Sequence, residues 1–206
     1  SILSILLGLD PMVRPLRQWE ARAVVPPSTL ATQYTDPRIA ESDKTMDQLR
    51  KLNPAIAAMH PFGAMLAEEC IPFMMLDLRC LGMETQALIP SYGEWLQNCD
   101  MRPSYVQHKK ALQALQYVQP TEAWSLKTPN HLWCLEIVRE FYPDARLIWT
   151  HRDPGPVTGS VASLNSTMQG VFAKDRDPLA VGEDWIGKLQ HAIRCGMEFD
   201  DANGDD

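Results

Sequence analysis

Residues 123–160 read AWSLKTPNHLWCLEIVREFYPDARLIWTHRDPGPVTGS, and their pattern changes from strand to helix and back to strand. Residues 123–127 and 146–150 carry the aromatic and branched side chains that are typical of strands. Between them Asn130 suits a helix N-cap, an apolar stripe follows at helical spacing, and Pro143 ends it. A crossover this short predicts two parallel strands with a right-handed connection, and therefore an α/β fold.

Polar segments follow both predicted strands, at residues 127–131 and 151–154. Ligands of such sheets bind at the carboxyl ends of the strands. Arg152 ends the second strand, and Ser160 follows eight residues later, about one turn into a predicted helix. A guanidinium fork, a hydroxyl and a helix N-terminus can together hold a small dianion. The alternative is that Arg152 pairs with a nearby acid such as Asp153 or Asp144 and Ser160 is an ordinary helix residue.

The rest of the chain is predicted to be mainly helical. Five prolines between residues 11 and 37 instead indicate an extended, turn-rich segment with Trp19 and Glu20 in its middle. A central helical block is expected to cover the acceptor side, with apolar lining from Met65, Phe73, Met74 and Met75. The helices expected from apolar spacing are 2–9, 38–52, 61–80 with a kink at Pro72, 91–98, 103–118, 156–168 and 184–197.

Composition excludes several classes of protein. A formal net charge of −7 over 206 residues argues against a nucleic-acid partner or a polybasic membrane surface. No apolar run reaches the ~18 residues of a membrane span. The five cysteines include no C-x-x-C pair, so we expect free thiols, no metal site and a cytoplasmic location. Ser1 opens directly into an apolar segment and the chain closes on FDDANGDD, which predicts one domain, residues 1–206, incomplete at both ends.

Three runs in this sequence, LKTPNH, FYPDARLIWTHRDP and VTGSVASL, resemble the PAPS-dependent sulfotransferase family. The resemblance implies a P-loop-NTPase-like parallel sheet flanked by helices. It also implies PAPS as co-substrate without a metal, with Arg152 and Ser160 holding its 3′-phosphate. The acceptor would be a small-molecule, saccharide or lipid hydroxyl, or an amine, and the oligomeric state stays open.

The same resemblance assigns residues to the reaction. The family's 5′-phosphosulfate loop has the form Gly-x-x-Arg-Ser/Thr-Gly-Thr-Thr/Ser, and alignment through Asp10-Pro11 makes Ser1 its last residue. Glu20 resembles the family base, which takes the acceptor proton. Lys127 resembles the cation that binds the cofactor and neutralises the leaving oxygen. Ser1 could instead be a mere chain start, Glu20 solvated or paired with Arg17 or Arg22, and Lys127 a surface ion pair.

Other assignments stay open in the sequence. His131 is a second choice of base, because imidazole titrates near neutrality, although a structural role is the alternative. Two rival functions remain. One is a P-loop kinase-like phosphoryl transferase, whose Gly-x-x-x-x-Gly-Lys-Ser/Thr loop is absent from these residues. The other is a non-catalytic relative that binds nucleotides.

Overall fold

Two short parallel strands, β1 (Val13–Pro15) and β2 (Ala123–Ser125), form the sheet. Val13 lies opposite Ala123 and Pro15 opposite Ser125. A computed structural model describes residues 2–204, which divide into two units. The first runs through Leu78 and includes Val106–Thr128; the second holds Arg79–Tyr105 and the chain from Pro129 onward. The expected α/β character is therefore confirmed in a reduced form, as many helices and a small parallel sheet.

The predicted strand at residues 146–150 was wrong. This segment has no regular structure, and no backbone hydrogen bond joins it to another residue in the described range 2–204. Leu147 is 41% exposed and Ile148 67% exposed. Strand propensity describes a fit to a half-buried pleated surface, so a segment without a paired neighbour does not become a strand. The parallel partner of β2 is β1, more than a hundred residues earlier in the chain.

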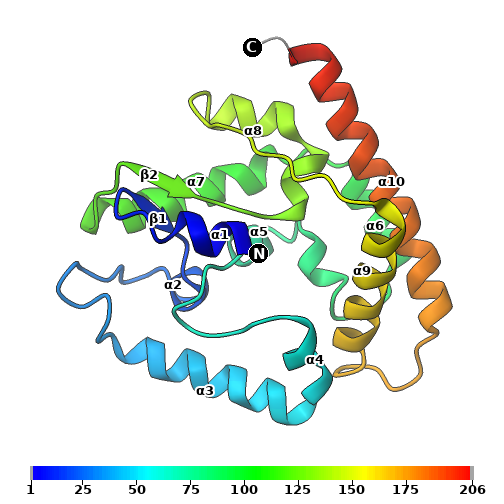
Figure 1. Cartoon of the computed structure of the whole chain (residues 1–206), viewed down its shortest axis with the longest axis horizontal. Coiled ribbons are helices and arrows are strands. Elements are labelled where there is room, and N and C mark those ends of the chain that lie inside the picture. The colour runs from blue at the N-terminus through cyan, green and yellow to red at the C-terminus, as the bar shows by residue number, and fades with distance from the viewer. Residues whose placement is uncertain (1, 205–206) are drawn as a thin grey trace. The chain divides into compact units, whose positions relative to one another are not determined.

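The first unit surrounds the sheet with helices. Figure 1 shows α1 beside β1, and α4 following α3 directly. Its core is built from large apolar side chains at Leu16, Trp19, Ile56, Phe73 and Leu115. The helices of this unit are α1 (Ile2–Leu7), α2 (Gln18–Arg22), α3 (Pro37–Leu52), α4 (Pro54–Met59), α5 (Ile71–Met75) and most of α7 (Arg102–Val118).

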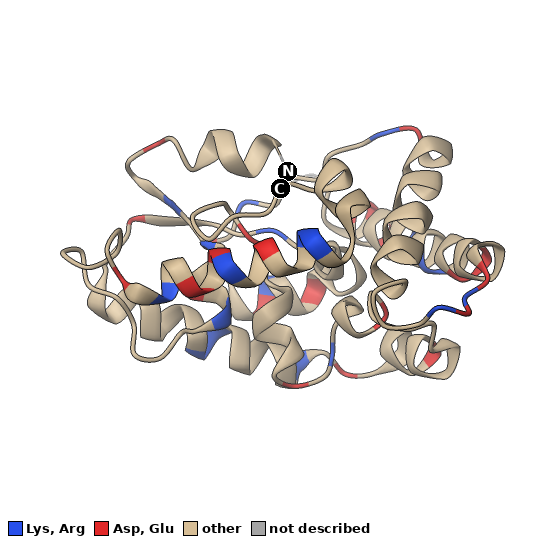
Figure 2. Ribbon diagram, turned by 90° about the horizontal axis from the view of Figure 1, so that it is seen from below, with Lys and Arg blue, Asp and Glu red and all other residues tan. Residues whose placement is uncertain are grey.

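Local sequence explains where these helices begin. The side chain of Asp36 caps α3 by accepting from the Arg38 amide at 3.0 Å, ahead of Pro37 in the first turn. Acidic and basic residues are interspersed along α3 in Figure 2, as expected for a solvated helix. The single helix predicted for residues 61–80 was wrong, because only α5 forms there and Pro72 lies in its first turn.

The second unit is almost entirely helical. Helices α9 and α10 lie side by side (Figure 1), which confirms the predicted final helix pair, with α10 longer than expected at both ends. Asn130 does not cap a helix; its Oδ1 accepts from the Leu81 amide at 3.3 Å. The elements of this unit are η1 (Leu81–Met83), α6 (Pro90–Asn98), η2 (Pro129–Trp133), α8 (Leu135–Phe141), α9 (Pro154–Gln169) and α10 (Pro178–Asn203).

A buried ionic cluster joins α10 to the start of this unit. Lys188 Nζ lies 2.6 Å from Glu84 Oε1 and also bonds Asp184. Burial raises the pKa of Glu84 above its usual value, although Lys188 opposes that shift. Gly93 is required beside the pair, because a Cβ there would come within 2.6 Å of Glu84 Oε1. None of the described helices is long and apolar enough to cross a membrane.

Candidate functional site

Glu20 lies on α2, which begins three residues after β1 ends, and only 1% of its side chain is exposed. Its Oε1 lies 2.7 Å from Nη2 of Arg14. The alternative of a solvated glutamate is therefore wrong, and the partner is Arg14 rather than Arg17 or Arg22. Glu20 Oε2 is buried and has no hydrogen-bond partner among the described residues. A buried carboxylate oxygen without a donor is costly unless a ligand or substrate engages it.

Arg14 is the residue that sequence reasoning missed. It lies in the middle of β1 and is buried. Its Nη1 donates to the carbonyls of Leu115, at 3.3 Å, and Gln119, at 3.0 Å. Its Cζ lies 4.6 Å from the centroid of the Trp124 ring. Burial lowers the pKa of Arg14, and the ion pair with Glu20 opposes that shift.

Lys127 follows β2 by two residues, at the same end of the sheet as Glu20 follows β1. Its Nζ lies 2.6 Å from Glu69 Oε1, and both side chains are partly exposed. Its carbonyl accepts from the Cys70 amide at 2.9 Å, which ties the strand end to the start of α5. The predicted surface ion pair thus exists. It does not exclude a catalytic role, because a half-exposed pair costs little to exchange.

A hollow of about 450 Å³ opens beside α2, and Ala21, the neighbour of Glu20, lines it. Its other walls include Val24, Val25, Pro72 and Met75. Met75, one of the residues expected to line the acceptor pocket, lines this hollow. By contrast, Phe73 and Met74 are wholly buried and belong to the core.

In the second unit, Arg152 lies two residues before α9 and Ser160 is the seventh residue of that helix, and both are exposed. No hydrogen bond or ion pair of Arg152 is found within residues 2–204, so the expected alternative of a pair with Asp153 or Asp144 is absent there. The Asp153 side chain caps α9 by accepting from the Gly155 amide at 2.9 Å.

The N-terminus of α9 has few amide donors left for an anion. Pro154 and Pro156 have no N–H, and the amides of Gly155 and Val157 both donate to Asp153. The backbone amides that were expected to donate to the anion are therefore mostly absent or already bonded. An anion at this end would depend on the Arg152 guanidinium, the Ser160 hydroxyl and the helix dipole.

His131 lies in η2 with its Nδ1 2.6 Å from the hydroxyl of Tyr105. Burial lowers its pKa to about 4. The imidazole is therefore neutral at physiological pH and a weak proton acceptor, which favours the structural alternative. Ser1, the predicted remnant of the phosphosulfate loop, lies outside the described residues.

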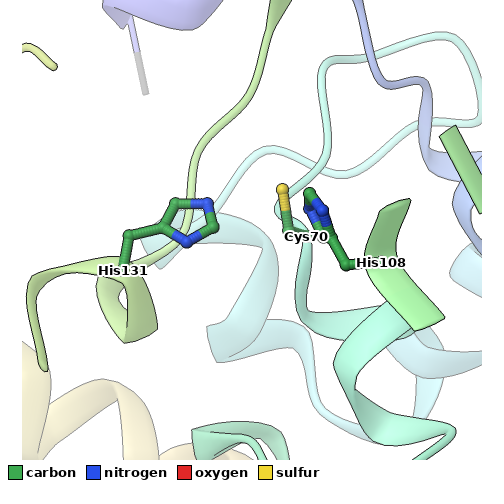
Figure 3. A group of neighbouring side chains, drawn as sticks. All are labelled: Cys70, His108 and His131. Carbon is green, nitrogen blue, oxygen red and sulfur yellow. The ribbon is translucent and has the colours of Figure 1, made fainter. Parts of the chain in front are cut away.

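Figure 3 shows Cys70 beside His108 in the first unit, with Cys70 Sγ and a ring nitrogen of His108 within 4.8 Å. His131, drawn in the same figure, belongs to the second unit. Burial raises the pKa of Cys70 to about 12, so this thiol stays protonated at neutral pH.

Known proteins resemble this chain in sequence and in fold. The model of the sulfotransferase family matches residues 1–205. The crystal structure of the sulfotransferase STF1 from Mycobacterium tuberculosis H37Rv matches with a TM-score of 0.83 and 28% identity over 95% of this chain and 54% of that one. For the sulfotransferase STF9 from Mycobacterium avium the TM-score is 0.84, at 29% identity, over 99% of this chain and 53% of that one. The chain thus spans about half the length of these two structures, and no curated protein sequence matches it.

Proposed function

The chain belongs to the sulfotransferase family, and we propose that the protein transfers a sulfuryl group from PAPS to a hydroxyl or amine acceptor. The observation that carries the proposal is the Glu20 carboxylate, which is buried, held by Arg14 and left with one oxygen without a donor. Such a group can take a proton from an acceptor inside a water-poor site. The family match supports sulfuryl transfer over the phosphoryl-transfer alternative.

The proposed chemistry divides between two side chains of the first unit. The acceptor oxygen attacks sulfur in line with the leaving oxygen, and Glu20 takes the acceptor proton. The bond between sulfur and the bridging phosphate oxygen breaks, and the electron pair stays on the departing nucleotide. Lys127 would neutralise the charge on that oxygen. Its Nζ, which lies 2.6 Å from Glu69 Oε1, would first have to leave that partner.

Two side chains of the second unit are proposed to hold the nucleotide. Arg152 is exposed and has no recorded partner within residues 2–204, so its five donors are available to the 3′-phosphate of PAPS. Ser160, also exposed, would add a hydroxyl donor. Because the first turn of α9 has few free amides, we expect these side chains to supply most of the local affinity. Ser1 is proposed to contribute at the phosphosulfate.

The hollow beside α2 favours an acceptor whose hydroxyl is carried on an apolar group. Val24, Val25, Pro72 and Met75 offer it hydrocarbon surface, and Arg22, the charged residue of the lining, offers it hydrogen-bond donors. A lipid or aromatic alcohol fits this lining better than a free saccharide, which needs many polar partners. A comparison of apolar and saccharide acceptors therefore tests whether this hollow binds the acceptor.

The remaining proposals concern organisation and location. The family model matches residues from both units, which supports the proposal that they belong to one P-loop-NTPase-like domain. Cys70, Cys80, Cys99, Cys134 and Cys195 are free thiols, which supports a cytoplasmic location.

The test is sulfuryl transfer by the natural full-length protein. Labelled PAPS is incubated with matched apolar, saccharide and amine acceptors, and labelled product is counted. Glu20→Gln should lower kcat about 100-fold or more, because the variant keeps the shape of the side chain but cannot take a proton. Glu41→Gln, at an exposed position of α3, is the control. Unchanged transfer by Glu20→Gln would refute the assignment of the base.

A further inference from the structure

We propose that Arg14 is the positioning residue of the reaction, which holds Oε1 of Glu20 so that Oε2 is the atom that takes the acceptor proton. This inference rests on the proposed function and on Glu20 as its base. Arg14 and Glu20 lie six residues apart, on β1 and on α2. No feature of the sequence pattern pairs them.

The two carboxylate oxygens of Glu20 differ in their surroundings. Oε1 accepts from Arg14 Nη2 at 2.7 Å, whereas Oε2 is equally buried but has no hydrogen-bond partner among the described residues. A carboxylate held at one oxygen keeps the other at a defined point. The bond that forms joins the acceptor oxygen to sulfur, the bond that breaks joins sulfur to the bridging oxygen of PAPS, and the acceptor proton ends on Oε2.

Arg14 is itself fixed on three sides. Its Nη1 bonds two backbone carbonyls near the end of α7, those of Leu115 at 3.3 Å and Gln119 at 3.0 Å. The ring of Trp124 on β2 covers its guanidinium, with Cζ 4.6 Å from the ring centroid. Arginine suits this place because one planar group reaches both carbonyls and the carboxylate together. In a lysine all three donors lie on one nitrogen, so it cannot occupy the separate positions of Nη1 and Nη2 from which Arg14 makes these contacts.

The arrangement continues from Gln119 to the loop that follows α2. Nε2 of Gln119 donates to the Ser28 carbonyl at 3.0 Å, to Ser28 Oγ at 2.9 Å and to the Thr29 carbonyl at 3.2 Å. Arg14 therefore links Glu20 to a residue that also holds the chain after α2. Rotation of the carboxylate would break its bond to Arg14 Nη2.

The rival explanation is that Arg14 only fastens β1 to the end of α7. The two roles predict different results in a double-mutant cycle on kcat. If Arg14 acts through Glu20, the variant that combines Arg14→Ala with Glu20→Gln is no slower than Glu20→Gln alone. If Arg14 only stabilises the fold, the two losses multiply.

The experiment measures kcat, the KM for PAPS and thermal unfolding in the natural full-length protein for Arg14→Ala, Arg14→Lys, Glu20→Gln and the double variant. Arg14→Ala should lower kcat about 100-fold with an unchanged KM for PAPS, because a misplaced base costs about that much. Added guanidinium ion should restore part of the activity of Arg14→Ala but none of that of Glu20→Gln. Arg50→Gln is the matched control, since Arg50 also pairs with a carboxylate, Asp47, and donates to a backbone carbonyl, that of Phe62.

The outcomes separate this inference from the proposed function. Loss of kcat in Glu20→Gln with wild-type kcat in both Arg14 variants overturns the role of Arg14 and leaves the base in place. Losses that multiply in the double variant, or a loss in Arg14→Ala that the unfolded fraction accounts for, also overturn it. Wild-type kcat in Glu20→Gln overturns the base itself, and with it the inference.

Discussion

In the first unit, each of the two proposed catalytic side chains forms an ion pair with another residue. In the second unit, the two proposed nucleotide-binding residues are exposed to solvent. Glu20 bonds Arg14, and Lys127 bonds Glu69. Arg152 and Ser160 lie at the surface around the start of α9. The side chains of the first unit are therefore held in place without a ligand, whereas those of the second unit are open to one.

This difference has an energetic meaning. The buried Glu20 carboxylate lost its water during folding, so the reaction does not have to reorganise it, whereas the partly exposed Lys127 must first leave Glu69. An exposed arginine stays hydrated until a phosphate displaces the water around it. Its electrostatic contribution therefore appears in the binding free energy of the nucleotide and in the salt dependence of that binding. We therefore expect substitutions in the first unit to change kcat and substitutions in the second unit to change nucleotide affinity, and three experiments test this difference.

The largest effect is expected at His131, the buried histidine of the second unit. Its pKa is about 4 when folded against 6.5 for the free group, so the unfolded chain binds more protons between these values. Stability from the neutral imidazole is full above pH 6.5 and is lost as pH falls toward 4, by on the order of 3 kcal/mol in all. Chemical denaturation at pH 7 and pH 5 measures the part of this loss that falls between those pH values, about 2 kcal/mol.

The control for this experiment is His131→Asn, which should remove most of that pH dependence and leave kcat nearly unchanged. The difference between the two proteins isolates His131 from other titrating groups such as Glu84. If His131→Asn instead lowered kcat as much as Glu20→Gln, the proton would be taken in the second unit and the comparison would fail.

The next effect is expected at Arg152. Arg152→Ala should weaken binding of a 3′-phosphorylated nucleotide by about 1.5–3 kcal/mol, or roughly 10- to 150-fold, because a charged hydrogen bond is lost. Binding of the nucleotide without the 3′-phosphate should hardly change. Calorimetry on both ligands measures the difference, with the exposed Arg146→Ala as control. Equal weakening of both ligands would remove the 3′-phosphate from this site.

The smallest effect is expected at Glu69, the partner of Lys127. Both side chains are partly exposed, so the pair is worth about 0.2–1 kcal/mol. Glu69→Gln should therefore leave Tm within a few degrees and change the affinity for PAPS by less than about fivefold. Lys127→Ala should instead lower kcat. An equal loss of kcat in both variants would mean that the pair itself, rather than the lysine alone, is needed.

Local patterns predicted the helices better than the sheet. The helices expected at 38–52, 91–98 and 103–118 are present as α3, α6 and α7, because caps and apolar stripes act within a few turns. The partner of β2 could not be predicted in this way, since β1 lies about a hundred residues earlier. The segment 146–150 shows the converse, because a strand-like composition is not sufficient without a neighbouring strand.

The sequence names candidate residues for the site but not the contacts that these residues make. Glu20 and Lys127 were identified from resemblance, and their burial and partners depend on tertiary packing that no motif encodes. The available signal for Arg14 was weak: an arginine flanked by Val13 and Pro15 in a short extended segment. The capping of α9 by Asp153 could have been read from the sequence, because Asp before Pro commonly caps a helix.

The segment 146–150 also favours aggregation in concentrated solution. Leu147, Ile148 and Trp149 are consecutive apolar residues, no proline interrupts them, and their backbone groups are not bonded to other residues within the described range. Short segments of this kind can stack with copies of themselves into cross-β aggregates. Within residues 2–204 these five residues have a strand-like composition but no neighbouring strand, so we expect them to contribute to aggregation of the chain.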